Sequence, residues 1–146
     1  MPLPRDAPRR LLVVDDDISI LELVSTRLTL AGYAVVTAKN GVEALSKLTE
    51  RRYDGMVLDL NMPQMDGFGV LECMADLPDP PPPTLVLTAS HNAADVQKAV
   101  KLGARDYLSK PFEDRQLLMR VSRLFRTQPP GGASMDDPLK VDFSDL

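Results

Sequence analysis

Apolar residues recur along this chain in two alternating patterns. Five short runs have the length and composition of buried strands, and they are Leu11–Val14, Tyr33–Val36, Met56–Leu58, Leu85–Leu87 and Tyr107–Leu108. Between them, apolar residues recur every three or four positions, as on one face of a helix. This alternation predicts a parallel sheet covered by helices on both faces. Right-handed crossovers then favour a doubly wound α/β fold.

The helical spacing predicts five helices, each with an apolar inner face. The first carries Leu21, Val24 and Leu28 and is expected to stop near Gly32. The inner faces of the other four are Val42, Leu45 and Leu48; Val70, Leu71 and Met74; Val96, Ala99 and Val100; and Leu117, Val121 and Leu124. Polar residues with the properties of helix caps precede four of the helices, and they are Asp17, Asn40 with Glu43, Asp66 with Gly67, and Asn92 with Asp95.

Charge and composition narrow the class of protein. The formal net charge of −4 argues against nucleic acid or an anionic membrane as the main partner. The single cysteine, Cys73, cannot form an internal disulfide and fits a reducing cytoplasm. No apolar run approaches the roughly 20 residues that span a bilayer, and residues 1–8 lack the apolar centre of a signal peptide. We therefore expect a soluble, cytoplasmic, single-domain protein.

Acidic residues follow two of the predicted strands directly. Asp15 and Asp16 come after the first strand, and Asp59 comes after the third. In open α/β sheets, ligands bind at the carboxyl ends of the strands. Carboxylates crowded there are unfavourable unless a cation neutralises them, and such oxygen ligands suit Mg²⁺. The sequence therefore predicts a magnesium site.

Two further polar groups belong to the same expected edge. Thr88 ends the fourth strand, and Lys110 follows the fifth. A carboxylate can act as a nucleophile and form an acyl phosphate. Phosphoryl transfer needs positioning and charge neutralisation, which Mg²⁺, an ammonium group and a hydroxyl can supply. Together these residues predict phosphoryl transfer onto a carboxylate.

Four motifs carry a resemblance to a known family. They are Leu11–Asp17 (LLVVDDD), Asp59–Gly67 (DLNMPQMDG), Leu87–Ala89 (LTA) and Tyr107–Phe112 (YLSKPF). In order and spacing they resemble the receiver domain of bacterial two-component response regulators, over about residues 9–128. The resemblance implies a flavodoxin-like fold with a five-stranded parallel sheet in the order 2-1-3-4-5 and five helices.

The resemblance also implies roles for individual residues. Asp59 is the expected phosphoacceptor, supplied by a sensor histidine kinase or a histidine phosphotransfer protein. The expected ligands of Mg²⁺ are Asp15, mainly through water, Asp16, Asp59 and the backbone carbonyl of Asn61. Thr88 and Lys110 are expected to contact phosphoryl oxygens, and Tyr107 is the expected aromatic switch. A cis peptide commonly joins the lysine and proline, here Lys110 and Pro111, and the side chains at Asn61 and Ser90 influence phosphate lifetime.

Regions outside the motifs admit more than one interpretation. Residues 1–8 are expected to be a disordered lead, and 129–146 a flexible acidic tail or a truncated linker. The alternating Leu139, Val141 and Phe143 leave open a docking segment or the start of a second domain. The prolines at 78 and 80–83 favour a stiff connector, or a polyproline ligand for aromatic grooves.

The last two helices and the strand between them are rich in cations. These residues are Lys98, Lys101, Arg105, Arg115, Arg120, Arg123 and Arg126. A solvated face is the ordinary interpretation, but in receivers this surface meets partners or a second copy. Arg120 and Asp106 match positions that pair across dimers in some DNA-binding relatives, whereas Lys101 stands where those relatives often carry an acid. A homodimer through this surface is therefore left open.

The expected function is a phosphorylation-activated signalling switch that acts through protein contact. It would bind neither nucleic acid directly nor a membrane, and would turn over no external substrate. An aspartate-nucleophile phosphatase is one rival, but it would need an acid two residues after Asp59, where Asn61 stands. A second rival is a non-phosphorylated interaction module, and a third interpretation is the receiver portion of a longer regulator whose output domain is missing.

Overall fold

Strands and helices alternate strictly along the chain. The computed structural model describes residues 7–89 and 92–126, and within these ranges it contains ten elements. The strands are β1 (Arg10–Val14), β2 (Ala34–Ala38), β3 (Gly55–Asp59), β4 (Thr84–Thr88) and β5 (Asp106–Ser109). The helices are α1 (Ile18–Leu30), α2 (Gly41–Glu50), α3 (Gly67–Met74), α4 (Ala93–Lys101) and α5 (Asp114–Arg123).

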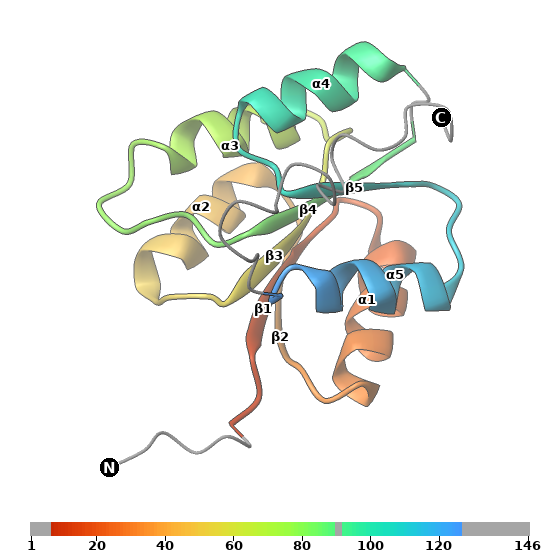
Figure 1. Ribbon diagram of the computed structural model, residues 1–146. Coiled ribbons are helices and arrows are strands. Elements are labelled where there is room, and N and C mark those ends of the chain that lie inside the picture. The colour runs from red at the N-terminus through yellow and green to blue at the C-terminus, as the bar shows by residue number, and fades with distance from the viewer. Residues whose placement is uncertain (1–6, 90–91, 127–146) are drawn as a thin grey trace.

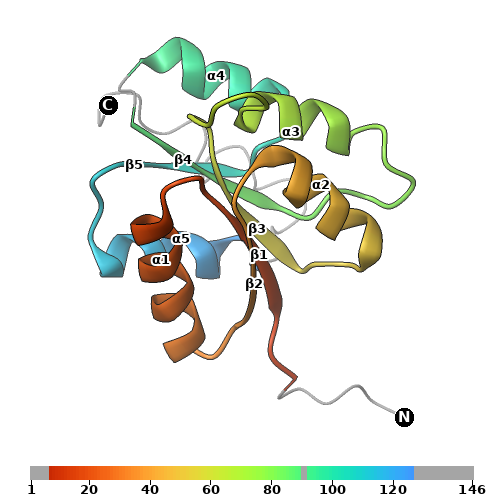
Figure 2. The same cartoon turned by 180° about the vertical axis from the view of Figure 1, so that it is seen from behind.

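All strand pairs are parallel, and the sheet order is β2-β1-β3-β4-β5. Figures 1 and 2 show α1 and α5 on one face of the sheet and α2, α3 and α4 on the other. The doubly wound fold, its strand order and its five helices are therefore confirmed. In this arrangement the carboxyl ends of all five strands lie along one edge.

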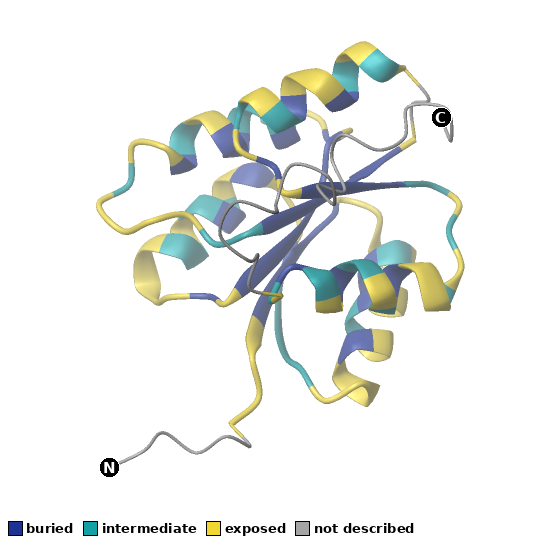
Figure 3. Ribbon diagram, viewed as in Figure 1, coloured by how far each residue is buried: buried dark blue, intermediate teal, exposed yellow. Residues whose placement is uncertain are grey.

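Alternate residues of the central strands supply two apolar cores. Leu11 and Val13 of β1 pack with α1 and α5, whereas Leu12 and Val14 pack with the helices of the other face. Strands β3 and β4 are buried along their whole length, as the dark blue ribbon of Figure 3 shows. The sheet is thus held rigidly from both sides, and it fixes the positions of the residues at its edge.

Local capping explains where several helices begin. Asp17 accepts hydrogen bonds from the backbone N–H groups of Ser19 and Ile20, at 2.9 and 3.4 Å. Asn40, Asp66 and Asn92 cap α2, α3 and α4 in the same manner. These predicted caps are confirmed. Helix α5 begins with a capping box between Glu113 and Gln116, which the sequence pattern did not reveal.

One predicted core position is wrong. Val42 was expected to face inward, but its side chain is 62% exposed. Helix α2 begins at Gly41, and its inner face follows the helical spacing through Gly41, Ala44 and Leu48. The start of the helix packs closely against the loop after β3. An added Cβ atom on Gly41 would lie only 2.8 Å from Cγ of Met65. Val42 therefore points away from the core.

Some expectations fall outside the described residues. Most of the N-terminal lead, Ser90 and the segment 129–146 are among these, so the statements about them stay predictions. Among the residues that the structure does describe, no helix has the length and apolar character needed to cross a membrane.

Candidate functional site

Strand register brings the predicted site residues to one edge of the sheet. Val14 pairs with Leu58, so Asp15 and Asp59, which follow them, end neighbouring strands. Asp59 pairs with Leu87, immediately before Thr88. Thr88 in turn pairs with Ser109, immediately before Lys110. Four separate chain segments thus deliver their polar side chains to the carboxyl edge.

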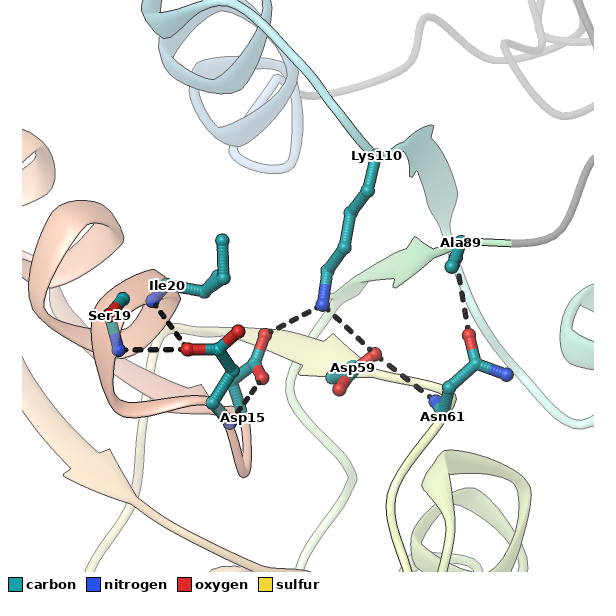
Figure 4. A network of polar contacts seen from close by, with 8 residues as sticks. Asp15, Ser19, Ile20, Asp59, Asn61, Ala89 and Lys110 are labelled. Carbon is teal, nitrogen blue, oxygen red and sulfur yellow. Dashed lines mark hydrogen bonds and ion pairs between the residues drawn. The ribbon is translucent and has the colours of Figure 1, made fainter.

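Lys110 forms ion pairs with both buried carboxylates. Its Nζ atom lies 3.0 Å from Oδ2 of Asp15 and 3.4 Å from Oδ1 of Asp59. Figure 4 shows the lysine side chain extending toward both aspartates. Asp15 is fully buried and Asp59 is 1% exposed, so the ammonium group neutralises charges that water cannot reach freely.

Backbone groups hold the same carboxylates in place. The N–H of Asp17 donates to Oδ1 of Asp15 at 2.9 Å, and the N–H of Asn61 donates to Oδ1 of Asp59 at 3.1 Å. These bonds leave Oδ2 of Asp59 without a hydrogen bond or ion pair to the described residues. One oxygen of Asp59 is therefore anchored, and the other is left as an acceptor.

The electrostatics of the site differ from those of ordinary surface carboxylates. Burial raises the pKa of Asp59 to about 6, with the charge of Asp15 acting in the same direction, against the Asn61 N–H and Lys110. Burial alone would lower the pKa of Lys110, but its hydrogen bond to Asp15 and the charges of Asp59 and Asp15 raise it overall. In the absence of another cation, the site is thus short of positive charge.

The three acids have a geometry that suits a metal ion. Asp15, Asp16 and Asp59 each offer a carboxylate oxygen, and these oxygens lie within 4.8 Å of one another. Asp16 is exposed, whereas the other two are buried, so the cluster faces solvent on one side. An all-oxygen donor set that is open to water fits Mg²⁺, which keeps several water ligands when bound.

The expected switch residues are buried in the neighbouring strands β4 and β5. Thr88 is 1% exposed and Tyr107 is 5% exposed. The guanidinium carbon of Arg120 lies 5.8 Å from the centroid of the Tyr107 ring.

Arg120 also forms an ion pair of 2.9 Å with Asp106, so these two residues pair within one chain here. The Lys110–Pro111 peptide is cis, as expected.

The structure adds one contact that the sequence did not predict. The backbone N–H of Ala89 donates to the side-chain Oδ1 of Asn61 at 3.2 Å. This bond, visible at the right of Figure 4, ties the loop after β3 to the loop after β4. Nothing in the local sequence indicates it, because the two residues are 28 positions apart.

Comparison with known proteins identifies the family. Residues 11–122 match the response regulator receiver domain. The chain belongs to this family. The matched range begins at the second residue of β1 and ends one residue before the end of α5.

Two relatives illustrate how far the similarity extends. The receiver is 42% identical over 116 residues to the probable transcriptional regulator ycf27 of Cyanidium caldarium, covering 80% of this chain and 46% of that protein. It is 40% identical over 139 residues to the transcriptional regulatory protein PrrA of Mycobacterium tuberculosis, covering 92% of this chain and 59% of the relative. The chain therefore spans about half the length of the curated relatives it matches.

A solved structure shows the same fold over its full length. The chemotaxis response regulator CheY4 of Vibrio cholerae superposes with a TM-score of 0.74 at 35% identity, covering 82% of this chain and all of that one. Receiver domains are signalling switches of two-component systems, interact with histidine kinases and bind Mg²⁺ at an acidic cluster. The grouping of Asp15, Asp16 and Asp59 fits that property.

Proposed function

We propose that this receiver accepts a phosphoryl group on Asp59 from a phosphohistidine of a sensor kinase or phosphotransfer protein. The observation that carries the proposal is the state of the Asp59 side chain. It ends a central strand, is buried beside Asp15 and Lys110, and keeps Oδ2 as an acceptor among the described residues. No other aspartate in the described ranges combines these properties.

In the proposed transfer, Oδ2 of Asp59 forms a bond to phosphorus as the phosphorus–nitrogen bond of the donor breaks. The bonding electrons stay with the imidazole nitrogen of the donor, which takes up a proton. Lys110 is positioned to hold one phosphoryl oxygen through its ammonium group, and the hydroxyl of Thr88 is proposed to hold another. The protein contributes mainly positioning and charge.

The metal-binding residues are proposed to be Asp15, Asp16, Asp59 and the backbone carbonyl of Asn61. When bound there, Mg²⁺ would neutralise the carboxylates and the incoming phosphoryl group. The support for this assignment is the distance between the three acids, together with the lysine that opposes them. Lys110 alone cannot balance the two buried carboxylates and a dianionic phosphoryl group.

We infer that the signal leaves through the surface formed by α4, β5 and α5. A phosphoryl group on Asp59 would compete with Asp15 for Lys110, at the end of β5. Tyr107 pairs with Val86, two residues before Thr88 in the neighbouring strand, so a shift of Thr88 would change the surroundings of Tyr107. A downstream protein, or a second copy of this chain, would then meet a changed surface.

A phosphatase activity on external phosphoesters is not supported. The residue two positions after Asp59 is Asn61, and its carboxamide accepts the Ala89 N–H. A carboxamide neither gives nor takes a proton as a general acid or base at neutral pH. The proposed chemistry is therefore self-phosphorylation and slow loss of the phosphoryl group, without turnover of another substrate.

Intact mass after incubation with acetyl phosphate tests the proposal directly. The chain has no tryptophan, so mass is a cleaner measurement than fluorescence quenching. We expect one added phosphoryl group that requires Mg²⁺ and is lost in Asp59→Asn but kept in Asp76→Asn, whose aspartate is exposed after α3. An adduct that persists in Asp59→Asn would show that another residue is the acceptor. If no adduct forms and no stable beryllofluoride complex forms either, the chain is an interaction module without phosphorylation.

A further inference from the structure

A pocket of about 370 Å³ lies at the edge of the sheet opposite to the acidic cluster. Its lining comes from the end of α2, the residues before β3, the end of α3 and the connection to β4. These segments meet at the amino ends of β3 and β4, whereas Asp59 and Thr88 end the same strands. The pocket is therefore separate from the proposed phosphorylation site.

The interior of the pocket is apolar. Tyr53 and Met74, which are 8% and 3% exposed, form part of its lining together with Leu48 and Leu77. The prolines at 80–83 form another part, and proline has no backbone N–H to offer a ligand. The carbonyl oxygens of Pro82 and Pro83 already accept bonds from Thr84 and Met56. This pocket thus suits apolar side chains rather than an added strand.

The charged residues of the lining are two arginines, Arg51 and Arg52, and two aspartates, Asp54 and Asp79. Arg52 reaches Asp79 at 3.4 Å, but both side chains are largely exposed, at 77% and 61%, and such a pair contributes little. Arg51 is exposed and makes no ion pair with the residues that the structure describes. Both guanidinium groups are therefore able to receive carboxylates from a ligand. The lining carries no net charge, but its exposed guanidinium groups can pair with acidic residues that stand beside an apolar segment.

The chain itself contains such a segment, and α5 ends at the edge of the sheet where the pocket lies. The ring of Phe125 packs against Gly55, where an added Cβ would lie 3.1 Å from its Cζ atom. Gly55 directly follows Tyr53 and Asp54, which line the pocket. The last described residue, Arg126, is next to Phe125. The chain therefore leaves the described fold at the same edge of the sheet as the pocket, but from the face covered by α1 and α5, whereas Tyr53 and Met74 pack on the other face.

The sequence after Arg126 matches the pocket in composition. Within residues 136–145, Leu139, Val141 and Phe143 alternate with polar positions, and four aspartates stand among them, at 136, 137, 142 and 145. The connecting residues 127–135 could span roughly 30 Å if extended. That length allows the chain to pass around the edge of the sheet to the pocket on a domain of this size.

We propose that residues 136–145 dock into this pocket within the same molecule. Apolar side chains of Leu139, Val141 or Phe143 would enter between Tyr53 and Met74, and the aspartates would lie against Arg51 and Arg52. The occupant is chosen because its alternating apolar residues suit the apolar lining, its aspartates can pair with the two exposed guanidinium groups, and the chain leaves the described fold at the same edge of the sheet. Attachment to the same chain also gives the segment a high effective concentration, which a separate peptide lacks.

Methionine methyl groups supply the test, because three of them lie at useful places. Met74 lines the pocket, Met135 adjoins the proposed segment, and Met119 on α5 is 46% exposed and away from the pocket. The full chain would be labelled with ¹³C-methyl methionine and compared with Leu139→Ser/Phe143→Ser. The control variant is Ser144→Asn, which leaves the apolar side chains intact.

We expect the Met74 and Met135 signals to move in the double variant, with Met119 unchanged and the control like the parent. A peptide of residues 133–146 added to the double variant should return Met74 toward its parent position. Arg52→Glu should also release the segment, and Asp142→Arg combined with it should restore docking. Unchanged Met74 signals in the double variant would overturn the proposal. A Met74 shift that depends on protein concentration would overturn it too, in favour of docking onto a second copy.

Discussion

The ammonium group of Lys110 lies 3.0 Å from Oδ2 of Asp15, although 95 residues and two intervening strands separate the two. The lysine thereby reaches across the ends of β3 and β4 and passes over Asp59, which it contacts at 3.4 Å. A single cation is shared between two buried carboxylates. This sharing makes the site responsive to any ligand that competes for the lysine or for the acids.

Replacing Lys110 with methionine should destabilise the metal-free protein by about 3 kcal/mol, because it leaves two buried carboxylates without an opposing charge. Mg²⁺ should recover a larger share of stability in this variant than in the parent. Urea unfolding at pH 7.5, with EDTA or with Mg²⁺, measures both effects. Lys101→Met, at an exposed position of α4, is the matched control and should change stability little. Equal stability of the two variants would contradict the shared-cation arrangement.

The stability of the metal-free protein should depend on the ionisation of Asp59. The folded-state pKa of this group is about 6, above its ordinary value of 3.8. The folded protein therefore holds more protons between these values, and its free energy of unfolding should fall as pH rises from about 4 to about 6. A shift of this size corresponds to roughly 3 kcal/mol. Urea unfolding in EDTA at several pH values gives the profile.

Asp59→Asn isolates this contribution, because it removes the titrating group and keeps the shape of the side chain. As the pH rises from about 4 to about 6, the parent should lose stability relative to the variant, which lacks the titrating carboxyl group. Burial also raises the pKa of Asp106, against the opposing charge of Arg120. Its effect on the pH dependence of stability is the same in both proteins and cancels in the difference. A difference that stays constant from pH 4 to pH 7 would show that Asp59 titrates as an ordinary surface acid.

Mg²⁺ should raise the thermal stability of the parent through binding to the folded state. At a concentration 100 times the dissociation constant, the gain is about 2.7 kcal/mol. Asp16→Ala should abolish the response, because it removes the exposed acid of the proposed metal site. Differential scanning calorimetry with and without Mg²⁺ measures it.

The neighbouring residue supplies the control for the metal experiment. Asp17 caps α1 through the N–H groups of Ser19 and Ile20, so Asp17→Ala should cost about 1 kcal/mol. It should nevertheless keep the full response to Mg²⁺. If Asp17→Ala loses the response and Asp16→Ala keeps it, the assignment of the metal-binding residues is wrong.

Gly67 should tolerate no side chain, because a Cβ there would lie 2.6 Å from the carbonyl oxygen of Asp59 and 2.7 Å from Cα of Leu60. Both are backbone atoms, so the loop that carries Asp59 would have to move. We expect Gly67→Ala to destabilise the protein by about 1–3 kcal/mol and to slow phosphorylation by acetyl phosphate. Urea unfolding and timed intact mass measure the two effects.

Gly32→Ala separates loss of stability from loss of chemistry. Gly32 has a φ of 103°, so alanine is strained there, but its Cβ would meet nothing within 4 Å. The expected cost is about 1–2 kcal/mol, with the phosphorylation rate unchanged. Similar rates for both glycine variants would show that close packing at Gly67 does not position Asp59.

The sequence by itself determined the order of the elements, most helix starts and the aspartates and lysine at the strand ends. These features depend on local rules, because strand runs, helical spacing and caps such as Asp17 and Asp66 involve residues close in sequence. The parallel topology then followed from the alternation of strands and helices. The roles of Asp59, Thr88 and Tyr107 came from the resemblance to receivers and stay proposals.

Tertiary structure alone decided which of these residues touch and what surrounds them. Val42 satisfies a helical pattern but faces solvent, since the packing of Gly41 against Met65 fixes the rotation of α2. The bond between Asn61 and Ala89 and the pocket lined by the prolines join segments that are distant along the chain. Local propensity cannot encode such contacts, because they depend on how the helices pack onto the sheet. Burial of the Asp59 carboxylate, which sets its raised pKa, arises in the same way.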